Sequence, residues 1–396
     1  MSYYTILQII PNLNAGGAEV GCLALGKDLK IKGHTSMIAT ASGQMIHEAL
    51  RNGIVIIQLP LDSKSPLKWL YNAYKLAKLI RLHGINLLHV RSRAPAWSVL
   101  WAAKATSTPW VSTYHGAYKQ QNRLKKYYNG IMTRGNAIIA PSQFMAQHIV
   151  EHYPLCAVRM HTILRGIDFH TLKTNNITNK NALALANQWE IKPNHRVILL
   201  PARFTRLKGH FTCIEAASKI KDLLTDQHVK IIFVGQHEHD HYFNSIQKTI
   251  KDYKLNHIIQ IEPHCRHLQN AYALSELVLI CSTQPESFGR TAVEAQAMGC
   301  LVIGTDHGGC KETIVHEKTG WLYPPGNSKS LADLIFIALN LDSVKKKSML
   351  KNSKNHAMEH FDEKDMLKKT IALYEKILKN QPDYSNRATS PAEHDT

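Results

Sequence analysis

The chain has 396 residues, of which 44% are hydrophobic and 20% are charged, and its formal net charge is +18. This length exceeds one typical domain core, so we expect two domains of an ordinary globular protein. No apolar run approaches the roughly 18 residues that span a bilayer, which argues against a transmembrane helix.

The N-terminal segment MSYYTILQIIPNLNAGG has no basic start, and Pro11 and Asn12 interrupt its apolar run. It therefore predicts a first strand and not a signal peptide. The cysteines include no C-x-x-C pair and are odd in number, and several lie in apolar runs. This pattern predicts buried free thiols in a reducing cytoplasm.

The positive charge is concentrated in the first half. Residues 1–190 hold 21 Lys and Arg against 7 Asp and Glu, a balance of +14, whereas the remainder holds 27 against 23, a balance of +4. Nucleic acid, an anionic membrane surface or a phosphorylated substrate would each suit such a field. We find no nucleic-acid motif and no basic arm with interleaved aromatics, so we expect no nucleic-acid partner.

Short β-rich segments alternate with helical patterns along the first part of the chain. The segments 17–33 and 65–84 carry apolar stripes with helical spacing. Such alternation is typical of βαβ units on a parallel sheet. The predicted strands are 5–10, 35–40, 54–59, 86–90, 110–115 and 136–141.

Polarity rises around residues 171–194, which we interpret as a linker containing a short helix. A second alternating series follows it, with predicted strands at 196–203, 229–235, 257–262, 277–282 and 300–305. The fold class is therefore α/β, with two Rossmann-like domains facing across a cleft at the carboxyl ends of their strands. The predicted parts are a domain 1–185, a domain 190–361, a helix of about 362–380 that can pack back on the first domain, and a disordered tail 381–396.

Gly16 and Gly17 follow the first strand and open a helix, where the backbone can approach a ligand and the helix N-terminus favours an anion. An ordinary tight turn between strand and helix explains the pair equally well. The segment is not a G-x-G-x-x-G fingerprint and no acidic ribose reader follows it, which disfavours an NAD site.

Arg203 and Lys208 lie just beyond a predicted strand, in LLPARFTRLKGH. Two cations five residues apart at a strand's carboxyl end can clamp a diphosphate. We expect Arg206, between them, to be solvated. An ordinary basic loop remains an alternative for the whole segment.

The stretch PESFGRTAVEAQAMG places Glu286 in a loop above the sheet and Glu294 about a turn and a half into the next helix. Gly289 opens that helix, and the amides of Gly289, Arg290 and Thr291 form an anion seat. A ligand that carries both hydroxyls and phosphate suits this arrangement. The plainer alternative is one glutamate in a helix's first turn and another facing solvent.

The pattern E-x-F-G-x-x-x-x-E at 286–294 is followed by Gly308-Gly309-x-x-Glu312. Upstream lie the Gly16-Gly17 loop, Thr113-Tyr114-His115-Gly116, and Arg203 with Lys208-Gly209. In this order, over nearly the whole chain, the combination resembles the retaining GT-B glycosyltransferases of family four. The segments HVRSRAPAW and YHGAY look more loosely like the branch found in bacterial envelope-polysaccharide and lipopolysaccharide gene products.

The resemblance implies a metal-independent hexosyltransferase with no cofactor and with a nucleotide sugar as co-substrate. Glu286 would bind hydroxyls of the donor sugar and Glu294 those of the ribose, while Arg203 and Lys208 would stabilise the diphosphate. His115 would contact the sugar near its 6-position. The remaining donor-binding residues would be Gly16, Gly17, Phe288, Gly289, Arg290 and Thr291. Front-face attack would require no protein nucleophile.

The acceptor implied is an anionic glycolipid or polysaccharide of the cell envelope, and the looser match implies a role in lipopolysaccharide biosynthesis. Arg91 and Arg93, at the end of a first-domain strand, are candidates for binding it, whereas we expect His89 to be a satisfied core histidine. A basic segment with Lys119, Arg123, Lys125, Lys126, Tyr127 and Tyr128 is either a membrane-surface helix or a solvated face. We expect Trp97 and Trp101 to lie in the core. The predicted location is cytoplasmic and peripheral on the inner face of the plasma membrane.

Residues 236–241, Gln-His-Glu-His-Asp-His, depart from the family pattern and invite a metal interpretation, but chance clusters are expected among 23 histidines. His264 and Arg266 are weak candidates for contacting the base. The alternative functions are a nucleotide-sugar epimerase on the same fold and a non-catalytic basic protein that binds membrane or nucleic acid. A phosphorylase would need a pyridoxal lysine context that we do not find.

Overall fold

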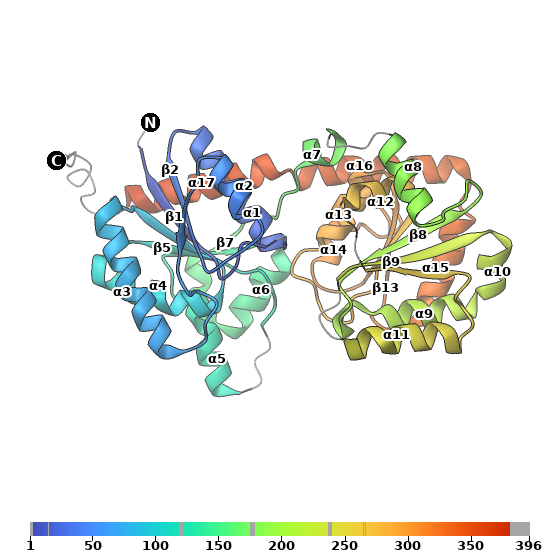
Figure 1. The fold of residues 1–396 in the computed structure, drawn as a ribbon, viewed down its shortest axis with the longest axis horizontal. Coiled ribbons are helices and arrows are strands. Elements are labelled where there is room, and N and C mark those ends of the chain that lie inside the picture. The colour runs from blue at the N-terminus through green and yellow to red at the C-terminus, as the bar shows by residue number, and fades with distance from the viewer. Residues whose placement is uncertain are drawn as a thin grey trace. The chain divides into compact units, whose positions relative to one another are not determined.

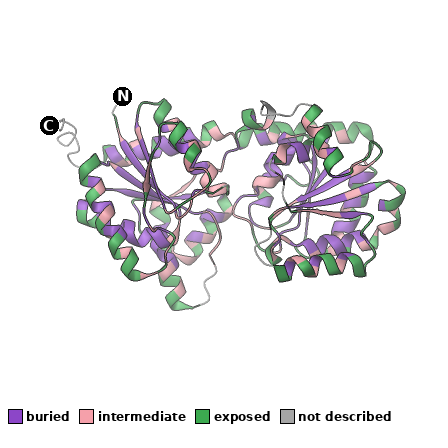
Figure 2. Ribbon diagram, viewed as in Figure 1, coloured by how far each residue is buried: buried purple, intermediate pink, exposed green. Residues whose placement is uncertain are grey.

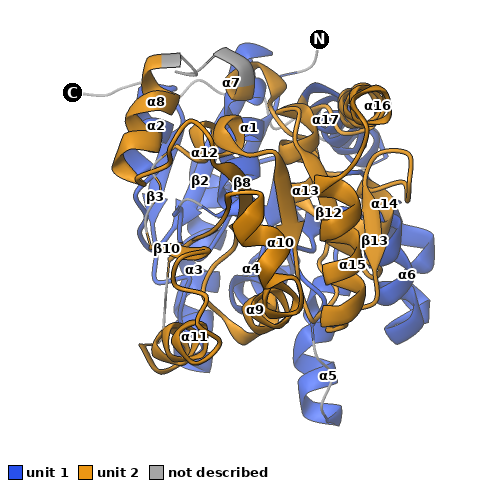
Figure 3. Ribbon diagram, turned by 90° about the vertical axis from the view of Figure 1, so that its right-hand side faces the viewer, with its two compact units in different colours: residues 1–164, 364–396 blue, residues 165–363 orange. Residues whose placement is uncertain are grey.

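The computed structural model describes residues 3–14, 16–118, 122–174, 179–236, 240–263, 265 and 267–380. The chain divides into two compact units, coloured separately in Figure 3. Unit 1 comprises residues 1–164 and 364–396, and unit 2 comprises residues 165–363.

Unit 1 is built on a seven-stranded sheet in the order β3-β2-β1-β4-β5-β6-β7 (Figure 1). Every pairing in it is parallel, and helices cover both faces. The strands are β1 Thr5–Ile9, β2 Thr35–Thr40, β3 Val55–Gln58, β4 Leu87–Val90, β5 Trp110–Thr113, β6 Ala137–Ala140 and β7 Met160–Thr162. The helices are α1 Gly17–Ile31, α2 Ile46–Arg51, α3 Pro66–His83, α4 Arg93–Thr106, α5 Arg123–Asn129, α6 Gln143–His152 and α17 Glu363–Lys379, with short 3-10 helices η1 Gly130–Thr133 and η2 Pro154–Arg159.

Unit 2 is built on a six-stranded parallel sheet in the order β10-β9-β8-β11-β12-β13. The strands are β8 Arg196–Pro201, β9 Val229–Val234, β10 Ile259–Glu262, β11 Leu277–Ile280, β12 Leu301–Thr305 and β13 Trp321–Tyr323. The helices are α7 Phe169–Thr174, α8 Asn179–Gln188, η3 Arg206–Lys208, α9 His210–Lys219, α10 Lys221–Asp226, α11 Asp240–Asp252, α12 Leu268–Leu274, α13 Arg290–Ala297, α14 Cys310–Thr313, α15 Ser328–Leu339 and α16 Ser343–His360.

The strands read as continuous apolar runs because parallel strands are covered on both faces. All four residues of β11, Leu-Val-Leu-Ile, are buried, and so are those of β4 and β6. Figure 2 shows the strands of both sheets buried and the outer sides of the helices exposed. Each sheet therefore forms the centre of its own unit's core.

The last helix, α17, belongs to unit 1 although it follows unit 2 in the chain. Its buried face carries Leu367, Ile371 and Tyr374, which lie in one apolar cluster with Ile6 of β1 and Val111 of β5. The helix pattern in KKTIALYEKIL thus reflects a face buried against the unit 1 sheet.

The prediction of two Rossmann-like parallel sheets is confirmed. The sequence did not indicate β7 and β13, because each is a three-residue edge strand, too short for a periodic pattern. The segment predicted as a linker contains α8, and unit 2 already begins at Arg165. Residues 381–396, predicted as a disordered tail, lie outside the described part of the chain.

The strand order reverses between β1 and β4 in unit 1 and between β8 and β11 in unit 2. Open α/β sheets bind ligands beyond the carboxyl ends of the strands at such a reversal. The residues that follow β8 and β11 are those of the two motifs predicted to bind the donor, at 203–208 and 286–294. Among the helices that the structure describes, none is long and apolar enough to cross a membrane.

Candidate functional site

The strand-order reversal in unit 2 creates a small hollow at the carboxyl edge of its sheet. β8 and β11 pair directly there, with Ile198 opposite Leu277. From β8 the chain continues through η3 into α9, and from β11 it continues through a loop into α13. The residues that line the hollow include Ala202, Lys208, Cys281, Ser282, Glu286 and Thr291.

Two groups hold the Glu286 carboxylate in this hollow. Lys208 Nζ lies 2.6 Å from Oε1 of Glu286, and the Ser282 hydroxyl donates a hydrogen bond to the same oxygen. Since both bind Oε1, the Oε2 atom keeps its lone pairs toward other donors. The Glu286 side chain is 18% exposed and lines the hollow.

A glycine brings Lys208 into this position. Gly209 has φ +68°, and a Cβ there would lie 1.8 Å from the carbonyl oxygen of Cys281. A side chain would therefore force the turn between η3 and α9 away from the end of β11. The glycine after Lys208 thus allows the backbone of this turn to lie close to the end of β11.

Glu286 is held in its ionised form. Burial alone would raise the pKa of this carboxyl, but the Lys208 ammonium, the hydrogen bonds from Lys208 and Ser282, and His307 together bring the pKa below its ordinary value of 4.5. At neutral pH the side chain therefore accepts hydrogen bonds and has no proton to donate.

The loop between β12 and α14 holds the backbone of the loop that carries Glu286. His307 Nε2 donates to the carbonyl of Ser282 at 2.8 Å, and the Gly309 amide donates to the Glu286 carbonyl at 2.8 Å. A Cβ on Gly309 would lie 2.2 Å from the carbonyl oxygen of Phe288. The Gly308-Gly309 pair therefore lets two loops pack backbone against backbone.

Glu294 is buried on α13, with 8% of its surface exposed. Arg290 Nε lies 2.5 Å from its Oε1, and the Tyr272 hydroxyl donates to its Oε2 at 3.0 Å. Burial, and then the Glu294 charge, raise the pKa of the Tyr272 phenol. These two contacts fix Glu294 in place. Since a carboxylate oxygen can accept two hydrogen bonds, Glu294 can still bind a further donor.

The N-terminus of α13 faces the loop between these glutamates. Gly289 has φ +98°, and a Cβ there would lie 2.8 Å from Thr313 Oγ1. The first turn of α13 contains no acid, whereas on α1 the Glu19 carboxylate would lie 2.4 Å from a Cβ on Gly16. The helix N-terminus of unit 2 is accordingly the better anion seat of the two.

Phe288 anchors the loop that carries Glu286. Its ring is 3% exposed and meets Phe361 edge-on, with ring centroids 5.4 Å apart. Arg203 and Arg206 are exposed on the segment after β8, and the buried Phe204 between them holds it to the core. The aromatic residues thus position the loops, while the charged side chains lie at the surface or at the hollow.

In unit 1, Gly16, Gly17 and His115 follow β1 and β5, at the carboxyl edge of that sheet. The two acceptor candidates make internal contacts. Arg91 is 7% exposed and donates through Nε and Nη2 to Gln8 Oε1, at 3.2 and 2.7 Å.

Arg93 lies over the ring of Tyr118, 3.9 Å from its centroid, and donates to Asn129 Oδ1 at 2.6 Å. These contacts give both arginines a structural role that strand position alone did not indicate.

The core interpretation of His89 is confirmed. Its ring is 1% exposed, Nε2 lies 2.6 Å from Thr113 Oγ1, and Nδ1 lies 2.5 Å from the Tyr374 hydroxyl. Burial, together with the Arg91 charge, lowers its pKa well below the ordinary value, so the ring is neutral. Trp97 is buried and Trp101 packs against it, as expected for core residues.

Several predicted candidates lie outside the described residues. They are His237, Glu238 and His239 of the cluster at 236–241, then His264, Arg266 and Lys119.

The sequence interpretation missed Ser282, His307 and Tyr272. Ser282 could have been recognised as the polar residue that ends β11, but nothing in the sequence pairs His307 or Tyr272 with the two glutamates.

Comparison with known proteins identifies both halves of the chain. A family model described as Glycosyltransferase Family 4 matches residues 15–171, and one described as Glycosyl transferases group 1 matches residues 183–356. A glycosyltransferase of known structure from Rickettsia africae is 35% identical over 96% of this chain and all of its own, with a TM-score of 0.88. The chain belongs to the GT-B glycosyltransferases.

More distant relatives of this glycosyltransferase differ in what they act on. The Anabaena protein HepE, solved with UDP-glucose, is 21% identical with a TM-score of 0.82, over 94% of this chain and 99% of its own. The Bacillus anthracis N-acetyl-alpha-D-glucosaminyl L-malate synthase is 23% identical over 93% of this chain and 96% of its own. The lipopolysaccharide 1,2-N-acetylglucosaminetransferase of Salmonella typhimurium is 28% identical over 51% of this chain and 52% of its own.

Replacing Ser282 with alanine removes one of the two donors on Glu286 Oε1, so the pKa of Glu286 should rise. A carboxyl whose pKa is lower in the folded than in the unfolded state stabilises the fold at pH values above the unfolded-state pKa. This stabilisation is lost as pH falls through the folded-state pKa. In the variant, the loss of stability on acidification should therefore begin at a higher pH. Thermal unfolding across an acidic pH series measures the shift. Thr283→Ala, next in the chain, is the control, and an onset at the wild-type pH in Ser282→Ala would contradict the assignment.

Proposed function

We propose that this glycosyltransferase is a retaining, metal-independent enzyme that moves a hexose from a nucleoside diphosphate sugar to an anionic cell-envelope glycan or glycolipid. The observation that carries the proposal is the Glu286 carboxylate, held ionised by Lys208 at the strand-order reversal of unit 2. Beside it lie a helix N-terminus without acidic residues and a second fixed carboxylate, Glu294.

Each part of a nucleotide sugar has a matching group in unit 2. Hydroxyls of the sugar would donate to Glu286 Oε2, since Lys208 and Ser282 bind the other oxygen. The diphosphate would lie against the first amides of α13, and the ribose hydroxyls would donate to Glu294. Binding of UDP-glucose by the structurally similar Anabaena protein supports this class of donor.

Lys208 and Arg203 would act on the leaving group. As the bond between the anomeric carbon and the phosphate oxygen breaks, negative charge grows on the diphosphate, where fixed cations stabilise the transition state more than the ground state. An ammonium has three donors, so Lys208 can hold Glu286 with one and turn the others to phosphate.

The acceptor oxygen would form the new bond on the face that the leaving group vacates, and its proton would pass to the departing phosphate oxygen. In this scheme no side chain forms a covalent intermediate. Glu286, ionised and fixed, orients the sugar and stabilises positive charge at the anomeric carbon.

Glu286→Gln keeps the size of the side chain but removes its charge, so it should lower kcat/KM for sugar transfer by at least about 100-fold, as is typical for loss of a transition-state contact. Turnover of a panel of nucleotide sugars, with transfer or hydrolysis as the readout, measures this. Glu215→Ala is the matched control, because Glu215 is exposed on α9 in the same unit. Full activity in the Gln variant would reject Glu286 as a donor-binding residue.

A retaining reaction should give a product with the anomeric configuration of the donor. Proton NMR of the anomeric coupling constant during turnover reports this configuration. A metal-independent reaction should, in addition, survive excess EDTA. Inversion would rule out front-face attack with phosphate as the base, and loss of turnover in EDTA would contradict a metal-independent reaction.

The charge of unit 1 supports an anionic acceptor at a membrane. The 88 residues from Ser63 to Val150 contain thirteen lysines and arginines and no aspartate or glutamate. A field of this sign attracts anionic lipids and acidic glycans alike. The Salmonella lipopolysaccharide transferase supports an envelope acceptor, whereas the Bacillus malate synthase supports a small anionic one.

Within this run, α3 and α5 expose apolar side chains among their basic ones. We call this surface the basic-apolar face. Stacking of Trp69 on Tyr128, with ring centroids 5.9 Å apart, brings the start of α3 beside the end of α5. Large apolar residues beside lysines suit the interface of an anionic bilayer. The face consists of Leu67, Leu70, Tyr71, Tyr74, Leu82, Leu124 and Tyr127, with Lys64, Lys68, Lys75, Lys78, Arg81, Arg123, Lys125 and Lys126.

Replacing Leu67, Leu70 and Tyr74 with serine should weaken binding to vesicles that contain phosphatidylglycerol by about tenfold or more, because each side chain loses burial in the bilayer interface. Co-sedimentation at low salt measures this, and raised salt should weaken the wild-type protein too. Phe336→Ser, on an exposed position of α15 in unit 2, is the control. Equal binding of the triple variant would reject this face as the membrane contact.

A further inference from the structure

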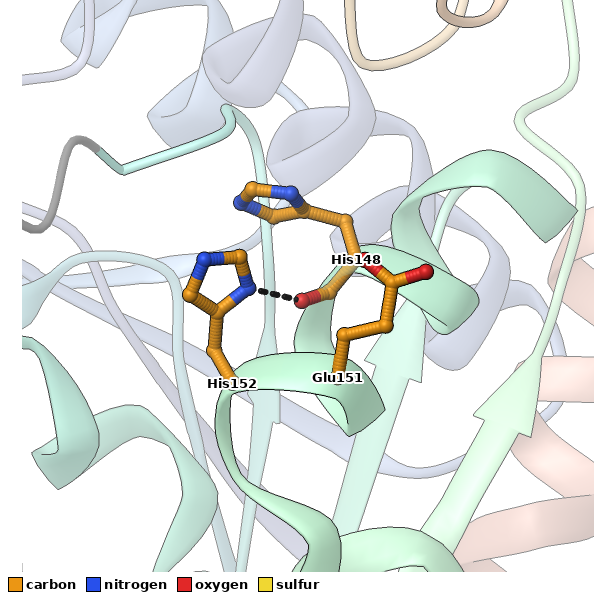
Figure 4. Close-up of side chains that lie close together, drawn as sticks. All are labelled: His148, Glu151 and His152. Carbon is orange, nitrogen blue, oxygen red and sulfur yellow. Dashed lines mark hydrogen bonds between the residues drawn. The ribbon is translucent and has the colours of Figure 1, made fainter.

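The last turns of α6 carry three potential metal ligands on one face of the helix. His148, Glu151 and His152 stand at positions i, i+3 and i+4, which neighbour one another on a helix. One ligand atom from each residue lies within 4.8 Å of the others. Figure 4 shows the two imidazole rings side by side, with the Glu151 carboxylate next to His148.

The ring of His152 is already oriented as in a metal site. Its Nδ1 donates to the backbone carbonyl of His148 at 2.7 Å, because a carbonyl can only accept. This bond fixes the tautomer and leaves the Nε2 lone pair for a cation. Histidines that bind metals commonly donate their other ring N–H to a carbonyl or carboxylate in this way.

The ring of His148 lies next to that of His152. The centroids of the two rings lie 4.4 Å apart.

We propose that His148, Glu151 and His152 bind a divalent cation of the zinc class. Two imidazoles at i and i+4 together with a carboxylate form the mixed nitrogen and oxygen set that Zn²⁺ prefers, with a fourth position left to water. Bonds of about 2.0–2.2 Å require ligand atoms about 3.4 Å apart, so the side chains of His148 and Glu151 would have to rotate to close the site around a cation. The carboxylate of Glu151 would supply a negative charge to offset that of the cation. Glu151 directly follows the segment 63–150, which contains no aspartate or glutamate.

This site is separate from the chemistry of sugar transfer. α6 starts after the carboxyl end of β6 and runs back before β7, which is parallel to β6. The triad, at its end, therefore lies toward the amino edge of the sheet, opposite the edge with Gly16 and His115. The next residue, Tyr153, donates its hydroxyl to the Lys126 carbonyl of α5 at 2.8 Å. A bound cation would stabilise the turn that holds α5.

Zinc titration of the metal-stripped full chain tests the proposal through thermal stability, which a cation bound only to the folded state must raise. We expect Zn²⁺ to raise the Tm by a few degrees. His152→Ala and Glu151→Gln should each weaken this response, with an apparent Kd at least about tenfold higher. His360→Ala is the matched control: His360 pairs with His356 at the same helical spacing on α16, with ring centroids 4.8 Å apart.

Because the chain has 23 histidines, location needs a second readout. Crystals soaked in Zn²⁺ should give an anomalous peak at the zinc edge within bonding distance of His148 and His152. A peak at other histidines with none here would overturn the proposal, as would a zinc response in His152→Ala equal to that of the wild-type protein. None of these readouts depends on glycosyl transfer, so the outcome is independent of the proposed function.

Discussion

The candidate site depends on the contact between Lys208 and Glu286, which joins residues 78 positions apart in the chain. Three features bring them together: the pairing of β8 with β11, the glycine that follows Lys208, and the loop that ends at Gly289. Each is a backbone feature. The site is therefore a consequence of how the two strand ends meet, and the charged side chains only complete it.

The same contact decides what Glu286 can do. Burial alone would protonate a carboxyl and make it a general acid, whereas a nearby ammonium keeps it charged. Here the ammonium, with two hydrogen bonds, outweighs burial, because the pKa lies below its ordinary value. A buried ion pair adds little to stability, since desolvation offsets its attraction. Its value lies in presenting a fixed, charged acceptor to a ligand.

The sequence predicted the two sheets, and it indicated the motifs at 203–208 and 286–294, because these leave local patterns: apolar runs, glycines at turns, and charges at strand ends. It did not predict which charges line the hollow. Lys208 and Arg91 both follow strands at a strand-order reversal, yet one faces the hollow and the other is buried against Gln8. The difference depends on partners distant in sequence, such as Glu286 for Lys208. A one-dimensional pattern does not contain such pairings.

The two units differ in what the polar groups beside the strand-order reversal contact. In unit 1 the polar groups on the strands beside the reversal bind one another: Arg91 binds Gln8, and His89 binds Thr113 and Tyr374. Changing any of them would leave a buried polar group without its partner, at a cost of about 1–3 kcal/mol. The polar groups on the strands of unit 1 are thus held in the core, so its loops and exposed helices are the parts that can vary at less cost. In unit 2, by contrast, Lys208 and Glu286 line the hollow beside the reversal, where their charges can meet a ligand.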